Sequence, residues 1–120
     1  ILSRMVREVH TVERIGDLSE SAAGTLDRLG MKNVHFHVGD GSRGWPDEGP
    51  FDAIVVAAAS PRVPESLTSQ LAEGGRLVIP VGAAHSQTLT LVRRTKKGLS
   101  TTDVCPCIFV KLIGREGYEA

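Results

Sequence analysis

The nine residues Phe51–Ala59, which read FDAIVVAAA, constrain the fold more than any other part of this 120-residue chain. The run is almost continuously apolar and β-branched in its middle, which is typical of a strand covered on both faces. Such strands occur in parallel sheets, because the crossover connections place helices over the faces. A second run of this kind, Arg76–Val81, lies further along the chain. Both runs predict an α/β fold.

The chain before Phe51 alternates between strand and helix patterns. Short strands are predicted over Glu8–Glu13 and Val34–Val38, where apolar residues alternate with polar ones. Asp17 or Ser19 is the predicted cap of an intervening helix, and Gly30 is the glycine that ends it. The apolar residues of that helix recur at near-helical spacing: Leu18, Ala22, Leu26 and Leu29.

The chain after Ala59 continues the alternation and then departs from it. The predicted elements are a short helix, a buried strand and two extended segments: Pro64–Leu71, Arg76–Val81, Gln87–Thr95 and Thr101–Leu112. Gly74 and Gly75 are predicted to end the short helix. The last two strands have no helix between them, so they predict an antiparallel closing hairpin. Residues 1–120 are therefore predicted to form one doubly wound, Rossmann-like α/β domain with a mostly parallel sheet.

Charge and hydropathy exclude several kinds of partner. Lys plus Arg equals Asp plus Glu at 14 each, and the two signs are interspersed along the chain. No global field attracts such a protein to nucleic acid or to a membrane surface. No apolar stretch approaches the roughly 20 residues of a membrane span, and the amino terminus lacks the apolar run of a signal peptide. The prediction is a cytoplasmic protein without nucleic-acid or membrane partners.

The sequence predicts no metal site. Cys105 and Cys107 are too few for a disulfide scaffold, and no C-x-x-C pair or clustered set of histidines and cysteines occurs. Two cysteines two residues apart in a strand share a face, and packing is their predicted role, with redox or metal sensitivity as the alternative. The four histidines show no partner pattern and are interpreted as surface or strand-packing residues: His10, His35, His37 and His85.

Ligands of doubly wound sheets lie beyond the carboxyl ends of the strands, so the residues that follow each strand are the candidate site. Glu13 follows the first strand, and its two acceptor oxygens suit the vicinal hydroxyls of a ribose. Asp40 follows the second strand, and the glycines on either side would let the backbone approach a flat ring such as adenine. Small residues over 57–61 follow the third strand and leave room for a ligand. Each feature alone also fits a surface charge, a turn or strand packing; together they favour a nucleotide site.

Longer strings in the same places resemble one family. V-E-R-I at Val12–Ile15, G-D-G at Gly39–Gly41, W-P-D-E-G-P-F-D-A-I-V-V-A-A-A at Trp45–Ala59, V-P at Val63–Pro64 and L-A-E-G-G-R-L-V-I-P-V-G at Leu71–Gly82 are similar to protein-L-isoaspartate O-methyltransferases. The resemblance implies a seven-stranded methyltransferase sheet with S-adenosylmethionine as methyl donor. It also implies an L-isoaspartyl carboxyl in a damaged protein as acceptor, whose methyl ester breaks down through a succinimide and so allows repair.

Matched by position, the resemblance assigns site residues. The cofactor-binding residues are Glu13, with Arg14 beside it, for the ribose and Asp40 with Gly41 for the adenine. The substrate-binding residues come from two segments: Ala58, Ala59, Ser60 and Pro61 in the loop bordering the substrate, and Phe109 and Val110 in the segment that covers the active site.

The chain also departs from the family pattern. The glycine-rich first motif and the amino-terminal region with the active-site serine or threonine have no counterpart, so the resemblance implies a domain truncated at its amino terminus and leaves the catalytic residues unassigned. The family's F/Y-V-P-L segment reads Phe109–Leu112 here, with lysine in place of proline. The absent strand would lie between the strand before Glu13 and the strand over Phe51–Ala57, which would leave two open sheet edges able to pair with another chain.

Two other functions compete with the enzyme. The first is a non-catalytic relative that keeps part of the nucleotide pocket and self-associates through those open edges. The second is another nucleotide-binding enzyme, such as a dehydrogenase, against which the closing hairpin and the E-G-G-R-L-V-I-P-V-G string at Glu73–Gly82 argue.

Overall fold

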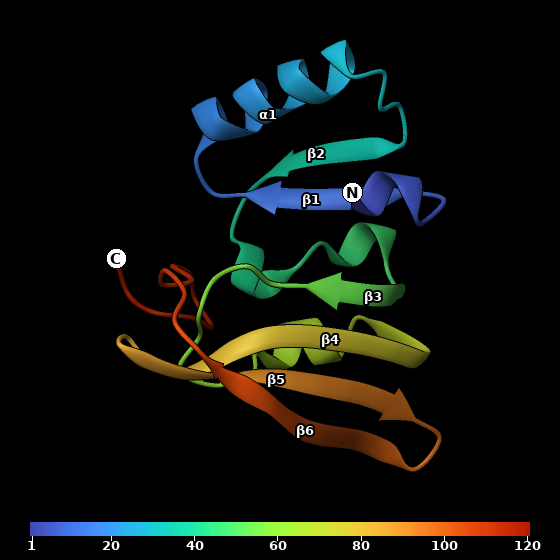
Figure 1. The fold of residues 1–120 in the computed structure, drawn as a ribbon. Helices are drawn as coiled ribbons and strands as arrows, with labels where there is room; N and C mark the ends of the chain where they lie inside the picture. Colours follow the sequence, from blue (N-terminus) through green and yellow to red (C-terminus); the bar gives the residue numbers. More distant parts are fainter. The chain divides into compact units, whose positions relative to one another are not determined.

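A computed structural model describes all 120 residues, which form two compact units, Ile1–Gly41 and Ser42–Ala120 (Figure 1). The longest helix has 13 residues, and none of the helices is long and apolar enough to cross a membrane. The prediction that residues 1–120 act as one domain stays a prediction.

The first unit is a strand–helix–strand motif. Strand β1 (Val9–Glu13) pairs in parallel with β2 (Val34–Val38), and α1 (Gly16–Arg28) connects them. A short 3₁₀ helix, Leu2–Arg4, precedes β1. Parallel neighbours need such a crossover connection, so the alternation of patterns in the sequence predicts this motif correctly.

The sequence predicts the carboxyl end of α1 correctly but not its amino-terminal cap. The predicted side-chain cap is wrong, because Ile15 is the N-cap residue and Asp17 lies inside the first turn, where its charge favours the helix dipole. Gly30 is confirmed as the terminating residue: its φ is +73°, and its N–H donates to the Asp27 carbonyl at 3.0 Å. The predicted apolar face is mostly uncovered, since Leu18 and Leu29 are 54% and 62% exposed.

The second unit is a four-stranded sheet with the strand order β3-β4-β5-β6. Its strands are β3 (Phe51–Val55), β4 (Leu71–Ala83), β5 (Ser86–Thr95) and β6 (Gly98–Cys107). β3 and β4 run parallel, whereas β5 is antiparallel to both of its neighbours. The predicted closing hairpin is therefore confirmed. Five apolar side chains form the core of this unit: Leu67, Leu71, Leu77, Ile79 and Val92.

The predicted helix Pro64–Leu71 is too long. Helix α2 spans only Glu65–Thr68, and Leu71 already begins β4. Gly74 and Gly75 do not end a helix but lie within β4, where Gly74 has a φ of +80°. Phe51 pairs with Leu71 and Ala53 with Arg76, so two steps along β3 correspond to five along β4. The glycines allow the sharp backbone turn by which β4 accommodates these extra residues.

The strand β3 is not covered on both faces as predicted, because Val55 is 60% exposed. It is also an edge strand, since its one partner is β4. β1 likewise has one partner within its sheet, β2. Each of these two strands is therefore an edge strand of its own sheet, which agrees with the predicted edges.

The last extended segment also departs from prediction. β6 begins at Gly98 and ends at Cys107, so residues 108–112 lie outside the strand. Cys105 is exposed and Cys107 is half-buried, and both are free thiols. The predicted packing role is therefore wrong for Cys105.

Candidate functional site

The parallel register of the first unit brings the predicted cofactor residues to one edge. Glu13 pairs with Val38, and the N–H of Gly39 donates to the Glu13 carbonyl at 3.0 Å. Asp40 follows directly, so both carboxylates emerge beyond the carboxyl ends of adjacent parallel strands, and both residues are half-buried. Gly41 begins the next 3₁₀ helix, whereas Arg14 is exposed. This is the position in which doubly wound folds bind nucleotides.

The side chain of Glu13 is held in place by the loop that follows it. Its Oε1 accepts a hydrogen bond from the N–H of Ile15 at 2.9 Å. A carboxylate offers about four lone-pair positions, so this bond leaves acceptor capacity for two hydroxyl groups. The chemistry of the site therefore fits an adenosine group: paired acceptors for the ribose from Glu13 and an acceptor for an exocyclic amine from Asp40.

The predicted substrate residues, which come from two distant segments, are brought together in the second unit. The N–H of Ala59 donates to the Val110 carbonyl at 2.7 Å, and the N–H of Leu112 donates to the Ala59 carbonyl at 2.8 Å. The N–H of Phe109 donates to Oε1 of the buried Gln87 at 2.7 Å. The segment after β6 therefore lies alongside the loop after β3.

Only some of these residues present a surface that a ligand could touch. Ala59 and Ser60 are fully buried, and Ser60 is fixed between the Pro80 carbonyl and the N–H of Gly82, at 3.0 Å each. Pro61 is exposed, Ala58 is half-buried, and Val110 is 75% exposed. Ala59 and Ser60 thus support the loop, and the residues around them form its accessible rim.

Glu116 is a structural residue of this region that the sequence gives no sign of. Its carboxylate accepts hydrogen bonds from both the N–H and the hydroxyl of Ser66, at the start of α2. Its N–H donates to Oγ of Ser42 at 3.0 Å, and its carbonyl accepts from Oγ of Ser60 at 3.3 Å. The hydroxyl and the N–H of Ser66 hold the pKa of Glu116 below its ordinary value. No local motif reveals this arrangement, because the partners are 50 to 74 residues away.

Comparison with known proteins identifies the family. The sequence model described as protein-L-isoaspartate(D-aspartate) O-methyltransferase matches residues 1–117. The chain belongs to this family. A protein-L-isoaspartate O-methyltransferase of Trichlorobacter lovleyi is 52% identical over 120 residues, and one of Roseiflexus castenholzii is 54% identical over 118 residues. These matches cover 99% and 98% of this chain but 55% and 54% of the relatives, so the chain spans about half of their length.

Solved structures carry the same fold. A structure named protein-L-isoaspartate O-methyltransferase superposes with a TM-score of 0.83 at 32% identity, over 92% of this chain and 35% of that one. A crystal structure from Plasmodium falciparum, described as a protein-L-isoaspartate O-methyltransferase in complex with S-adenosyl-L-homocysteine, gives a TM-score of 0.75 at 29% identity. It is matched over 88% of this chain and 52% of its own length. The fold of the chain is thus the Rossmann-like fold of this methyltransferase family.

Proposed function

We propose that this chain supplies the adenosine-binding and acceptor-side parts of a protein-L-isoaspartate O-methyltransferase, which methylates L-isoaspartyl carboxyl groups of damaged proteins for repair. The observation that carries the proposal is the position of Glu13 and Asp40 at the carboxyl ends of adjacent parallel strands, within a chain that matches the family over residues 1–117. The complex of the Plasmodium falciparum relative with S-adenosyl-L-homocysteine supports S-adenosylmethionine as the cofactor.

The residues of this chain would act by binding and orientation. S-adenosylmethionine, when bound, supplies a methyl group on a positively charged sulfur that leaves readily. Glu13 would accept from the ribose hydroxyls, and Asp40 would accept from the adenine amine, with Arg14 and Gly41 beside them. The acceptor is already a carboxylate at neutral pH, so no strong general base is required. Orientation of two reactants can contribute roughly 7–11 kcal/mol, which makes positioning the main catalytic effect here.

The rim of the second unit would bind the acceptor peptide. Pro61 and Val110 are exposed, and Phe109 is 38% exposed, on segments that backbone hydrogen bonds tie together. Apolar side chains on a fixed backbone suit an extended peptide of varied sequence, because they bind without requiring particular charges. Ala58, Ala59 and Ser60 would shape this rim from below.

Calorimetry and a methyl-transfer assay on an isoaspartyl peptide test the proposal. The G-x-G-x-x-G string of these 120 residues, Gly39–Gly44, contains the proposed adenine residue Asp40 and leaves no second such loop for the methionine part of the cofactor, so we expect weak binding of S-adenosylhomocysteine and no transfer. The decisive protein joins this chain to the part of the Trichlorobacter lovleyi relative that has no counterpart here. This fusion should bind the cofactor and methylate the peptide.

Variants of that fusion identify the site residues. Glu13→Gln should weaken cofactor binding, whereas Glu20→Gln, which changes an exposed acid on α1, serves as the matched control. Asp40→Asn should weaken binding more for the adenosyl cofactor than for an analogue without the exocyclic amine. A fusion that folds but neither binds nor transfers would disprove the proposed function; equal effects of Glu13→Gln and Glu20→Gln would remove Glu13 from the site.

The open edges of β1 and β3 favour a second candidate, a non-catalytic protein that self-associates. Each of these strands has a single partner, and exposed edges with apolar side chains such as Val55 pair readily with other chains. Sedimentation of the chain tests this. Val55→Lys should reduce association, whereas Leu29→Lys, at an equally exposed apolar position beyond a helix, should not. A monomer at all concentrations would exclude this candidate.

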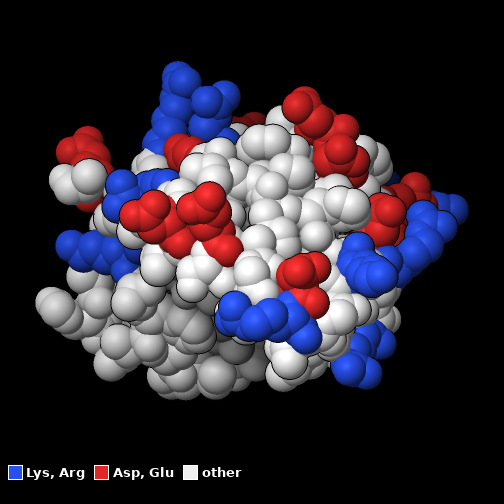
Figure 2. All heavy atoms as spheres, turned by 90° about the horizontal axis from the view of Figure 1, so that it is seen from above, with Lys and Arg blue, Asp and Glu red and all other residues white.

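Nucleic acid and membranes are not among the partners we propose. In Figure 2 the lysine and arginine side chains alternate with aspartate and glutamate and form no field of one sign on the face shown. The formal net charge of zero agrees with this distribution. The predicted cytoplasmic location stays a prediction.

A further inference from the structure

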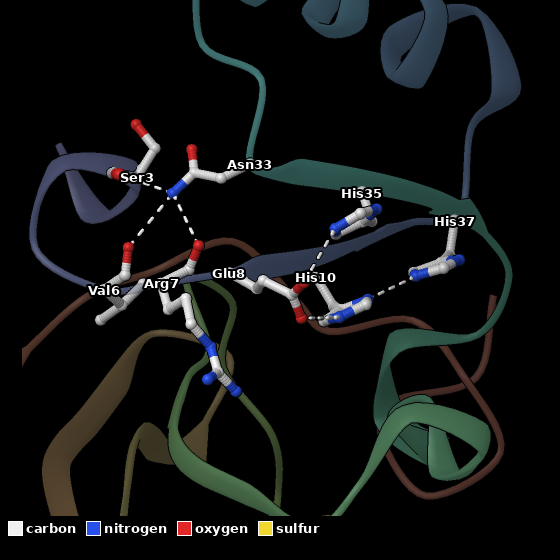
Figure 3. A network of polar contacts seen from close by, with 8 residues as sticks. All are labelled: Ser3, Val6, Arg7, Glu8, His10, Asn33, His35 and His37. Carbon is white, nitrogen blue, oxygen red and sulfur yellow. Dashed lines mark hydrogen bonds and ion pairs between the residues drawn. The ribbon is translucent and has the colours of Figure 1, made fainter.

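Three histidines that the sequence keeps apart meet on one face of the β1–β2 pair (Figure 3). The parallel register pairs His10 with His35, and His37 lies two residues further along β2 on the same face. The ring of His10 stacks on that of His35, with centroids 4.7 Å apart, and lies nearly parallel to that of His37, whose centroid is 5.3 Å away. Glu8, two residues before His10, adds a carboxylate to this face.

The atoms that could bind a metal lie near one another. Oε2 of Glu8 lies 4.0 Å from Nε2 of His10, and its Oε1 lies 4.0 Å from Nε2 of His35. One ligand atom from each residue can be chosen so that all three lie within 4.8 Å of one another. Tetrahedral zinc with bonds of about 2.1 Å separates its ligands by roughly 3.4 Å, so pairs of these atoms need to approach by up to about 1.4 Å.

The exposure of the three side chains allows two of them to move toward the third. His10 is only 12% exposed, whereas the side chains of Glu8 and His35 are 57% and 46% exposed and can turn toward it. The backbone before Glu8 is held by Asn33, whose Nδ2 lies 2.7 Å from the Ser3 carbonyl and 3.2 Å from the Arg7 carbonyl. His10 is therefore held in place, and Glu8 and His35 can rotate toward it.

His37 completes the arrangement by orienting His10. Nδ1 of His10 lies 3.0 Å from Nε2 of His37. If Nε2 of His10 binds a metal, its ring proton must sit on Nδ1, from which it donates to His37. Histidine ligands in proteins almost always donate their second ring N–H to an acceptor, most often a carboxylate, a backbone carbonyl or water, which fixes both tautomer and orientation; here Nε2 of His37 would be that acceptor.

We propose that Glu8, His10 and His35 form a binding site for a divalent transition metal of the zinc class, with His37 as the positioning residue of His10. Two imidazoles and one carboxylate are ligands that zinc and cobalt prefer, whereas magnesium and calcium prefer oxygen alone. A metal there would tie β1 to β2 and leave a fourth coordination position for water. The site is separate from Glu13 and Asp40, so it goes beyond the proposed methyltransferase function.

A cobalt titration of the tag-free 120-residue chain tests the site. We expect one Co²⁺ per chain, a visible absorption band of a tetrahedral centre, displacement by Zn²⁺ and no displacement by excess Mg²⁺. His35→Ala and Glu8→Gln should each weaken binding by about 100-fold or more. His37→Ala should keep the band and weaken binding by about 10–100-fold, the effect of losing a partner of a metal ligand.

His85→Ala is the matched control, since His85 is exposed and lies outside β1 and β2, and it should bind cobalt as the parent chain does. The decision rests on His35→Ala, because loss of the largely buried His10 also endangers folding; circular dichroism confirms that His35→Ala keeps its secondary structure. The proposal is overturned if no tetrahedral band develops, if Mg²⁺ displaces the metal, or if His35→Ala and His85→Ala bind alike.

Discussion

The two units, residues 1–41 and residues 42–120, are stabilised by different kinds of contact. Every fully buried apolar side chain of the molecule lies in the second unit, whereas the only buried residue of the first is Ser19. The first unit is held mainly by contacts between elements that are close in sequence, because α1 connects the two strands that pair in parallel. The second is ordered by a core and by contacts between distant segments. The residues proposed to bind the adenosine group and the buried core thus lie in different parts of the chain.

The largest expected difference between the units is in stability. Leu77→Ala removes a fully buried core side chain and should lower the free energy of unfolding of the second unit by about 2–5 kcal/mol. Leu26→Ala, in the half-buried face of α1, should cost clearly less because water already reaches the site. Urea unfolding together with hydrogen exchange of each unit measures both. Equal losses would mean that the first unit has a core of comparable strength.

Substitutions in the two units should affect different ligands, and the free-energy changes should be slightly smaller than those in stability. In the fusion protein described above, Glu13→Ala should weaken cofactor binding by about 1–3 kcal/mol, the scale of hydrogen bonds to a charged group, and leave the KM for the peptide unchanged. Phe109→Ala should raise the KM for the peptide and leave cofactor affinity unchanged. Calorimetry and steady-state kinetics give the two values, and a variant that changes both would couple the two units.

Glu116 offers a test that uses pH. Because Ser66 lowers its pKa in the folded state, the ionised carboxylate stabilises the second unit above the ordinary carboxyl pKa, and this contribution is lost as the pH falls through the lowered value. Glu116→Gln should cost about 1–2 kcal/mol at pH 7 and should flatten this part of the acid dependence. Glu119→Gln, an exposed neighbour, is the control. Identical unfolding profiles for the two variants from pH 7 to pH 3 would contradict the role of Glu116.

The smallest effects are expected in the helix of the first unit. Gly30→Ala places a side chain at a φ of +73° and should destabilise by about 1 kcal/mol, although nothing lies within 4 Å of the added methyl group. Gly24→Ala lies inside α1, where the nearest atom to the added methyl group is Nη1 of Arg28 at 4.0 Å, and should stabilise by about 0.5–1 kcal/mol. Thermal unfolding followed by circular dichroism detects both signs. Destabilisation by Gly24→Ala would show an unrecognised contact of that helix face.

Local patterns in the sequence predict most of this fold correctly. The strands around Val34–Val38 and Gln87–Thr95, the end of α1 at Gly30 and the closing hairpin depend on residues close together in the chain, and all were predicted. The failures concern positions decided by distant partners. Gly74 and Gly75 have the signature of a helix end, yet the pairing of Phe51 with Leu71 places them in a strand.

The site follows the same rule. The rule that ligands lie beyond strand ends identified Glu13 and Asp40, and the family resemblance identified the segment beside Ala59. Neither revealed Glu116 or the meeting of His10 with His35, because both arise from register and packing across the chain. The roles of the predicted site residues stay predictions until the variants are measured.

The large sequence separation between Glu116 and its partners also affects the order in which the two units fold during synthesis. Ser66 leaves the ribosome 50 residues before Glu116, and Ser42 leaves it 74 residues before. At a synthesis rate of roughly 5–20 residues per second, the segment that holds the loop at Ala59 is made about 3–10 seconds after the loop itself. The strand–helix–strand motif of the first unit has its partners within 30 residues and meets no such delay. Nascent chains of this protein should therefore fold the edge proposed for the nucleotide well before the rim proposed for the peptide is in place.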